Sequence, residues 1–433
     1  MSEREKTNRA VSVARDIDMS KGEFLEHEFE TYSLLREMLP VARIGSSMLR
    51  GPDELEKGAW LVTRYDDGCD VLSNTDGFSS QASDYPVRPW IPQAIDPPQH
   101  TSYRRIMNKW FTPDAMSAME PHLEEFAEEL VDKMLEKDEF DFVADFADPF
   151  PAKIFCELMG FPVEDHEWIM DYKNMLMHAN DGHSGGARLA REKAEELGAA
   201  VNDDSTLPPD TMIQVRGTIA MGLYGYFGKL LEARRAEPTD DLITRLIEAS
   251  YEDERELTEE ELLDTMFLYY MAGLDTVASC LGLTIISLAE NPDKRQEFVE
   301  LMEDPLKVTM AVEELVRVNS IVVLPRRCTE DQVFDGAEFK TGDQVICPTQ
   351  ACNRDPEQFE NPDEIIFDRV PNRHMGFGHG PHRCLGIHLA RREMRIALQV
   401  LHRKLPDYEL HPEKKPELFG GMKGASQVWL RKK

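Results

Sequence analysis

Apolar residues recur at three- and four-residue intervals over much of the chain. This spacing is typical of amphipathic helices and predicts them over residues 24–39, 119–135, 152–160, 187–200, 212–236 and 387–401. Residues 257–290 are apolar on most sides, so they predict one long helix in the centre of a globule, which Asn291 and Pro292 end. The pattern therefore predicts a mainly α fold.

Short apolar runs between turn residues predict a small β subdomain. Such runs lie at 60–63, 320–325 and 344–348, and residues 335–343 have the turn residues of a hairpin. Residues 79–99 carry five prolines and predict an irregular loop, in which Tyr85, Trp90 and Ile91 are candidates for a pocket wall.

The chain of 433 residues contains no linker, repeat or low-complexity tract that would divide it. We therefore expect a single domain over residues 1–433, with a flexible N-terminus over about 1–20. Residues 168–177 are rich in methionine, and the helical pattern breaks at 182–186 and again at 202–209.

The amino-acid composition limits which binding partners and which cellular compartment are expected. The formal net charge of −32 argues against a nucleic-acid partner. The polar N-terminal segment has no hydrophobic core for secretion or membrane anchoring, and seven cysteines without a C-x-x-C pair fit a reducing compartment. We expect a cytoplasmic protein without a membrane partner.

The string FGHGPHRCLG, residues 377–386, stands directly before the amphipathic run at 387–401. Its glycines allow positive backbone angles and a close approach to a flat group. Cys384 lies at the start of the predicted helix, where unpaired N–H groups favour an anionic sulfur. The alternative for a lone cysteine is a buried, inert side chain.

This string resembles the haem-binding signature of the cytochrome P450 family. The resemblance implies the P450 fold, in which haem b lies between a long central distal helix and a proximal helix. It further implies that Cys384 is the thiolate ligand of the iron, with Phe377 and Gly378 in the haem-binding loop. The resemblance also implies that residues 180–210 form an extended lid loop region over the substrate.

Residues 272–276, AGLDT, lie within the long apolar helix and resemble the oxygen-binding motif of the same family. Gly273 leaves space for a diatomic ligand, and the Thr276 hydroxyl can bend the helix. Activation of O2 consumes two protons, for which Thr276 and Asp275 are the candidate donors. The structural alternatives are a Thr276 hydroxyl bonded to the carbonyl four residues back and an ion-paired Asp275.

His100 and Arg104 lie four residues apart on a predicted helix and suit a carboxylate. The resemblance assigns that carboxylate to a haem propionate, and it adds Arg326 and His382 as further donors. Arg327 competes with Arg326 but would point to the opposite face of a strand.

Glu314 and Arg317 are three residues apart on one helical face, among apolar neighbours. The family has a Glu-Arg-Arg network, which Arg369 would complete here. We expect these three residues to support the cysteine loop rather than to take part in catalysis.

The candidate pocket residues are nearly all apolar and predict an apolar substrate, such as a terpenoid, an alkyl aromatic or a steroid-like ring system. They are Trp90, Leu268, Met271, Ala272, Val322, Val323 and Met422.

The resemblance implies a haem-thiolate monooxygenase that inserts one atom of O2 by hydroxylation or epoxidation. Electrons would come from NAD(P)H through a ferredoxin reductase and a ferredoxin. The ferredoxin would dock on basic residues near the cysteine, which are Arg105, Lys109, Arg373, Arg383, Arg391 and Arg392. The alternatives are a haem-thiolate peroxygenase or isomerase and a non-catalytic haem sensor.

Overall fold

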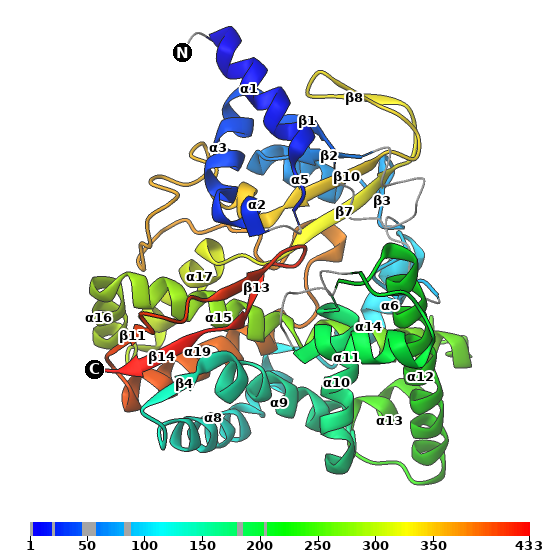
Figure 1. Cartoon of the computed structure of the whole chain (residues 1–433). Helices are drawn as coiled ribbons and strands as arrows, with labels where there is room; N and C mark the ends of the chain where they lie inside the picture. Colours follow the sequence, from blue (N-terminus) through cyan, green and yellow to red (C-terminus); the bar gives the residue numbers. More distant parts are fainter. Residues whose placement is uncertain (1–2, 20–21, 46–57, 82–87, 180–184, 203–205) are drawn as a thin grey trace. The chain divides into compact units, whose positions relative to one another are not determined.

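A computed structural model describes residues 3–19, 22–45, 58–81, 88–179, 185–202 and 206–433 (Figure 1). The chain divides into two compact units. The sheet unit comprises Met1–Asp84, Met116–Phe146 and Ser279–Lys433, and the helical unit comprises Tyr85–Ala115 and Ala147–Ala278. Each unit is described by itself below.

The largest sheet of the sheet unit joins segments that are far apart in the sequence. Its strand order is β1-β2-β10-β7-β3. Strands β2 and β10 pair in parallel, and the other neighbours are antiparallel. The bounds are β1 Val41–Ile44, β2 Ala59–Val62, β10 Gln344–Pro348, β7 Val323–Cys328 and β3 Phe78–Ser79. The short apolar runs of the sequence thus form the predicted β region.

The N-terminal segment packs on this sheet (Figure 1, blue). Where the sequence predicted a flexible end, the structure has helix α1 (Glu3–Asp16), followed by α2 (Gly22–Glu26) and α3 (Glu28–Met38). Ala10 and Ala14 of α1 are buried in one core cluster with Leu61 and Ile346 of the sheet. The small apolar side chains on one face of α1 explain why this segment is ordered.

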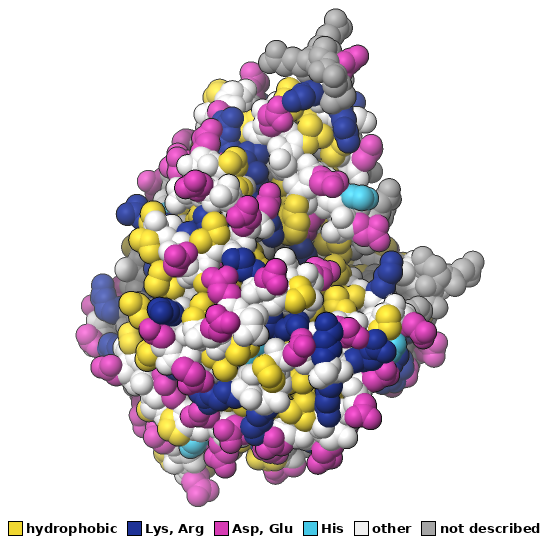
Figure 2. Space-filling view, turned by 90° about the vertical axis from the view of Figure 1, so that its left-hand side faces the viewer, with side chains coloured by type: hydrophobic (Ala, Val, Ile, Leu, Met, Phe, Trp, Pro, Cys, Tyr) yellow, Lys and Arg dark blue, Asp and Glu magenta, His cyan; other side chains and the backbone are white. Residues whose placement is uncertain are grey.

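Helix α19 (Ile387–Lys404) packs against α8 (Glu120–Met134). The contact is held at its edges by ion pairs, since Glu120 binds both Arg392 and Arg395 at 2.9 Å, and Lys404 binds Asp132 at 2.6 Å. Figure 2 shows a face of the molecule on which acidic and basic side chains are likewise interspersed. The large negative net charge is therefore locally compensated where basic residues gather.

The remaining elements of the sheet unit complete its second sheet, its hairpins and its helices. The second sheet has the order β11-β14-β4, and β12 pairs with β13 and β8 with β9. Their bounds are β11 Tyr408–Leu410, β14 Trp429–Lys432, β4 Glu139–Asp141, β12 Glu417–Phe419, β13 Gly424–Gln427, β8 Gln332–Phe334, β9 Ala337–Phe339, α5 Tyr65–Ser73, α16 Pro292–Leu301, α17 Pro305–Val318 and α18 Thr349–Cys352.

The helical unit is built around α12 (Pro209–Ala236) and α14 (Glu259–Gly273). Of the predicted lid region, residues 180–184 and 203–205 lie outside the described residues, and 185–196 form helix α11. The other elements are α6 Gln99–Met107, α7 Pro113–Ser117, α9 Pro149–Met159, α10 His166–Met177, α13 Leu242–Ile247, β5 Ser250–Tyr251 and β6 Arg255–Glu256. A π-helix over Val143–Ala147 connects the sheet unit to α9 along the chain.

The long apolar stretch 257–290 is interrupted rather than continuous. Helix α14 ends at Gly273 and α15 begins at Thr276, with Leu274 and Asp275 in a turn between them. The span Glu259–Glu290 is long and apolar enough to cross a membrane, but 67% of its most apolar window is buried inside the protein. Such burial is what a central core helix shows.

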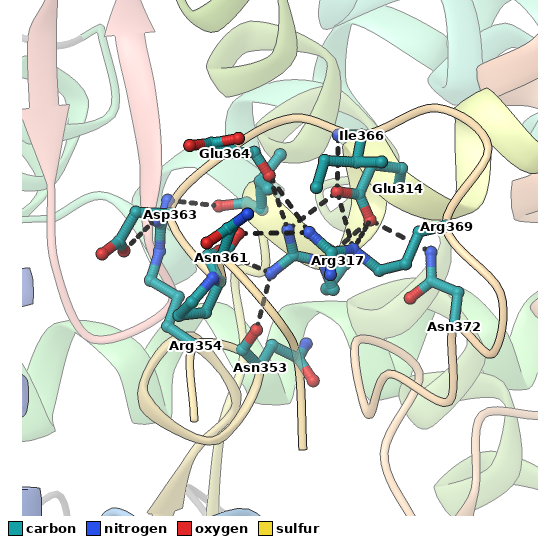
Figure 3. Close-up of polar contacts among 12 residues, drawn as sticks. Glu314, Arg317, Asn353, Arg354, Asn361, Asp363, Glu364, Ile366, Arg369 and Asn372 are labelled. Carbon is teal, nitrogen blue, oxygen red and sulfur yellow. Dashed lines mark hydrogen bonds and ion pairs between the residues drawn. The ribbon is translucent and has the colours of Figure 1, made fainter. Parts of the chain in front are cut away.

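A buried ion network joins α17 to the segment that leads to the cysteine loop (Figure 3). Arg317 donates from Nε and Nη2 to the two oxygens of Glu314, each at 2.8 Å, and both side chains are fully buried. Arg369 Nε lies 3.1 Å from both of these oxygens, and Arg317 Nη1 donates to the carbonyls of Asn353 and Pro362. The structure thus brings the three predicted network residues together.

Glu314→Gln should destabilise the protein by about 3–5 kcal/mol, because two buried guanidinium groups would lose their shared counter-charge. Denaturant unfolding at neutral pH measures the loss. Glu297→Gln is the matched control, since Glu297 forms an exposed i,i+3 pair with Lys294 and such pairs contribute little. Equal effects of the two substitutions would contradict a supporting role for Glu314.

Candidate functional site

The loop before α19 holds Cys384 in a defined position. The Cys384 N–H donates to the Phe377 carbonyl at 2.9 Å, and the Gly378 N–H donates to the Met375 carbonyl at 2.9 Å. Gly380 has a positive φ of +71°, and a Cβ there would lie 2.5 Å from the Leu72 carbonyl oxygen. Glycine is therefore required where the loop approaches α5.

The Cys384 thiol differs from the other thiols in its exposure. Among the cysteines, all of which lie in the described part of the chain, Cys384 alone is exposed, while Cys69 is half-buried and the others are buried. The described residues include no group of three or more His, Cys, Asp or Glu side chains that could hold a bare metal ion. An exposed cysteine thiolate is a chemically suitable ligand for a haem iron.

Glu313 of α17 steadies the loop from one side. Its carboxylate accepts hydrogen bonds from Arg391 Nε at 2.7 Å and from His374 Nε2 at 3.2 Å. Burial would raise the pKa of Glu313, but these two partners outweigh burial and lower the pKa to about 2. The Arg391 guanidinium lies 5.2 Å from the Phe377 ring centre, so the loop's aromatic residue is held through the same cluster.

The predicted carboxylate donors come from both units. His100 and Arg104 lie on α6 of the helical unit, where His100 is buried. Arg326 of β7 is buried, while the neighbouring Arg327 points the other way and donates to the Gln81 carbonyl at 3.3 Å. The two arginines therefore lie on opposite faces of β7, and the role of Arg326 toward a propionate stays a prediction.

Strand β7 also approaches the cysteine loop. A Cβ on Gly378 would lie 3.8 Å from the Leu324 side chain, and Leu324 precedes Arg326 by two residues on the strand. His382 ends a short 3-10 helix, Gly380–His382, two residues before Cys384. Within the sheet unit, the strand that carries Arg326 therefore borders the loop that carries His382 and Cys384.

The helix interruption exposes the backbone beside Thr276. The Thr276 hydroxyl donates to the Ala272 carbonyl at 3.0 Å, which is the structural alternative that the sequence left open. Ala272 is exposed and Thr276 is half-buried, so the hydroxyl lies at an accessible surface of the interruption.

Asp275 is buried in a charged cluster of the helical unit. Its Oδ1 accepts from Lys173 Nζ and from His178 Nε2, each at 2.9 Å, and Lys173 also lies 3.6 Å from Asp148. Burial alone would raise the pKa of Asp275, but Lys173 and His178 outweigh it and hold that pKa far below its usual range. Asp275 is therefore an ion-paired carboxylate in this structure.

Lys173 and His178 were not among the residues predicted for the site. One signal for Lys173 lies in the sequence, because it occupies the apolar face of α10 between the buried residues Ile169 and Leu176. A lysine at such a position requires a buried acidic partner, but the spacing does not reveal which acid it is.

Gly273 makes room for an aromatic ring. A Cβ at this position would lie 2.2 Å from Cδ2 of Phe155 on α9. The absent side chain therefore lets α9 pack closely against the end of α14. The predicted role of Gly273 beside a diatomic ligand stays a prediction.

The candidate substrate residues form two local groups. In the helical unit, Trp90 stacks on Phe267 with ring centres 5.6 Å apart. Phe267 precedes Leu268 on α14, the helix that also carries Met271 and Ala272. Tyr85 lies outside the described residues.

In the sheet unit, Met422 lies in the turn between β12 and β13, and the following Lys423 N–H donates to the Ile321 carbonyl at 2.8 Å. This bond places the turn beside Val322 and Val323. The second local group is therefore assembled from two segments that are about 100 residues apart in the sequence.

Comparison with known proteins identifies the family and the fold of this chain. The family model described as Cytochrome P450 matches residues 93–421. A mycinamicin IV hydroxylase/epoxidase of Micromonospora griseorubida is 34% identical over 390 residues, which cover 88% of each chain. A vitamin D(3) 25-hydroxylase of Pseudonocardia autotrophica is 32% identical over 406 residues, which cover 91% of this chain and 90% of that one.

Among solved structures, cytochrome P450 PksS of the Bacillus subtilis bacillaene polyketide synthase superposes with a TM-score of 0.79. It is 29% identical, and the match covers 96% of this chain and 99% of that one. The family implies a haem, small-molecule substrates, O2 and redox partners. The glycine-containing loop with its exposed Cys384 fits that cofactor. The chain therefore belongs to the cytochrome P450 family and is a P450 monooxygenase.

Proposed function

We propose that the protein binds haem b through Cys384 Sγ and inserts one atom of O2 into an apolar small molecule, by hydroxylation or epoxidation. The observation that carries this proposal is the exposed Cys384 thiol in a loop that glycines and backbone hydrogen bonds hold at the start of α19. The bound haem would supply the centre at which O2 is activated.

The surroundings of Cys384 suit an anionic sulfur. The thiol lies three residues before Ile387, the first residue of α19, where unpaired N–H groups and the helix dipole stabilise negative charge. Arg383 adds a neighbouring positive charge. His100, Arg104, Arg326 and His382 would donate hydrogen bonds to the two propionates, and Phe377 and Gly378 would pack against the haem.

Thr276 and Asp275 are the proposed proton donors. The Thr276 hydroxyl is accessible at the helix interruption, whereas the Asp275 carboxylate is held by Lys173 and His178. An ionised Asp275 that accepts hydrogen bonds from both Lys173 and His178 carries no proton to deliver from this position. We infer that the carboxylate turns away from Lys173 and His178 to take up a proton and pass it to Thr276 Oγ1.

The proposed substrate is apolar and of medium size. The candidate residues that support this proposal are Trp90, Leu268, Met271, Ala272, Val322, Val323 and Met422. Two relatives are named for reactions on mycinamicin IV and vitamin D(3), which agrees with a sizeable, carbon-rich substrate class.

We further propose that a ferredoxin delivers electrons from NAD(P)H in the cytoplasm. Arg373 and Arg383 are exposed on the segment around the cysteine loop and support an acidic partner. Arg391 and Arg392 already bind Glu313 and Glu120, so their charges are largely compensated within the protein. The exposed arginines are therefore the better candidates for a docking site.

Cys384→Ser should abolish the absorption that sulfur ligation gives the ferrous carbonyl form, because a hydroxyl does not replace the thiolate. The spectrum of the purified, haem-loaded protein measures this. Cys69→Ser is the control and should keep the spectrum. A sulfur-ligated spectrum in Cys384→Ser would refute the proposed ligand.

Thr276→Ala should still consume NAD(P)H but divert a larger share of the electrons to hydrogen peroxide, since the proton that commits O2 to the reaction is lost. Product and peroxide are measured per NAD(P)H consumed, with a substrate chosen for its spin-state change in the Soret band. Unchanged coupling would count against the role of Thr276.

Lys173→Met should destabilise the protein at neutral pH by about 3–5 kcal/mol, because it leaves Asp275 buried without its main counter-charge. In the wild type the depressed pKa of Asp275 contributes stability above about pH 4, the unfolded value, which is lost only as pH falls toward the folded value. In the variant the pKa rises, so the deficit is small in acid and grows with pH.

Unfolding of wild type and Lys173→Met at several pH values tests this sign. Adding Asp275→Asn to Lys173→Met should restore part of the stability at neutral pH, since no buried charge remains unpaired. A deficit in Lys173→Met that does not depend on pH would show that Lys173 acts through packing alone.

A further inference from the structure

A lysine of the C-terminal hairpin is buried against the N-terminal segment of the sheet unit. Lys423 lies in the turn between β12 and β13, and its Nζ forms an ion pair with Glu28 Oε1. The two side chains are 11% and 3% exposed, although they are 395 positions apart in the sequence. Glu28 is the first residue of α3, where the helix dipole further stabilises a carboxylate. Because a buried ammonium group requires a counter-charge, this ion pair holds the turn against α3.

The next residue of α3 strengthens the same contact. The Lys423 ammonium lies 4.5 Å from the centre of the Phe29 ring, and the Arg354 guanidinium lies 3.8 Å from it. Arg354 is itself fixed, since it binds Asp363 at 2.7 Å and donates to the Val318 carbonyl at 3.2 Å. One aromatic ring thus contacts two cations from separate segments, and cation–π attraction adds to the ion pair.

The hairpin is fixed on a second helix as well. A Cβ on Gly424 would lie 2.7 Å from Ser279 Oγ, so the glycine lets β13 pack closely against α15 (Thr276–Glu290). Lys423, the last residue of the turn, adds bonds of its own. Its N–H donates to the Ile321 carbonyl at 2.8 Å, while its side chain forms the ion pair.

These bonds set the position of one candidate substrate residue. Met422 immediately precedes Lys423 in the turn and is half-buried. The segment that the turn contacts is held independently, because the Val322 carbonyl accepts from the N–H and the hydroxyl of Thr349 at 3.0 and 2.7 Å. The position of Met422 relative to Val322 therefore depends on the bonds that Lys423 makes.

We propose that Glu28 is a positioning residue for substrate selection, since through Lys423 it holds the turn that presents Met422 to the substrate. The proposal rests on the proposed function, because it takes Met422 and Val322 as substrate contacts. All four residues belong to the sheet unit, which also carries Cys384. Ligands large enough to contact Met422 depend on the ion pair, whereas a ligand that contacts only the haem does not.

Hydrogen exchange of the full chain tests the positioning without reference to catalysis. Glu28→Gln keeps the size of the side chain and removes its charge. Because breaking a buried ion pair is costly, exchange of the Lys423 amide should become about a hundredfold faster. Glu37→Gln is the matched control, since Glu37 lies on the same helix and forms an exposed pair with Lys6. It should leave the Lys423 amide at its wild-type rate.

Ligand titration of the haem-loaded protein tests the effect on selection. Clotrimazole, an imidazole with a large aromatic body, and imidazole itself are each titrated and followed by the Soret band. Glu28→Gln should raise the Kd of clotrimazole about tenfold, because a displaced turn presents Met422 in only a fraction of the molecules. The Kd of imidazole should stay at the wild-type value, and Glu37→Gln should change neither.

A double variant shows whether Glu28 acts through Met422. Met422→Ala should itself raise the Kd of clotrimazole, and adding Glu28→Gln to it should give no further rise. A further tenfold rise in the double variant would overturn the proposal, as would unchanged exchange at Lys423 in Glu28→Gln.

A second double variant separates positioning from stability. Glu28→Gln combined with Lys423→Met leaves neither charge of the pair, so it should recover stability that Glu28→Gln loses and still bind clotrimazole weakly. A wild-type Kd of clotrimazole in this variant would contradict the positioning role. A wild-type protein that binds no haem would refute the proposed function, and the exchange result would still decide whether Glu28 holds the turn.

Discussion

The position of Cys384 depends on two consecutive carboxylates of α17, of which Glu314 is fully buried and Glu313 is half-buried. Glu313 and Glu314 point to different sides of one helix, because neighbouring residues are about 100° apart around the axis. Glu314 binds Arg317 and Arg369, and Glu313 binds Arg391 and His374. Movement of the loop would leave charges buried without partners, which is far more costly than the loss of a surface ion pair. Charge pairing therefore gives the glycine-containing loop a rigidity that its own backbone lacks.

In the helical unit, buried carboxylates also join separate segments of the chain through hydrogen bonds and ion pairs. Asp275 and Asp264 each accept two hydrogen bonds at one oxygen from residues on other segments of that unit. The partners of Asp275 suppress its protonation, while those of Asp264 fasten a loop. A chain with 81 acidic residues thus employs a few of them inside, at the points where separate segments meet.

Much of this arrangement could be predicted from sequence because it depends on local pattern. The helical spacing, the proline-rich loop and the glycines around Cys384 each reflect constraints that act over a few residues. The alternation of Arg326 and Arg327 on β7 followed from strand geometry alone.

The remainder depends on contacts that the sequence does not encode locally. Lys173 and Asp275 are about 100 residues apart, and neither periodicity nor composition indicates that they pair. The sequence predicted a bend at Thr276 but not a full turn between two helices, because the long apolar stretch favours one continuous helix. Helix α1 was not predicted, because its buried face includes small alanines that give a weak hydrophobic signal. The contact of Gly273 with Phe155 could not be predicted either, since only the folded chain brings the two together.

Helix α1 and strand β14 are both built into packed structure, which limits how far the protein can be shortened. Ala10 and Ala14 of α1 cover part of the core cluster that contains Leu61 and Ile346, so deletion of the first helix would uncover apolar surface of the main sheet. Strand β14 (Trp429–Lys432) pairs with both β11 and β4. Removal of β14 would therefore leave two strands of the second sheet without a neighbour.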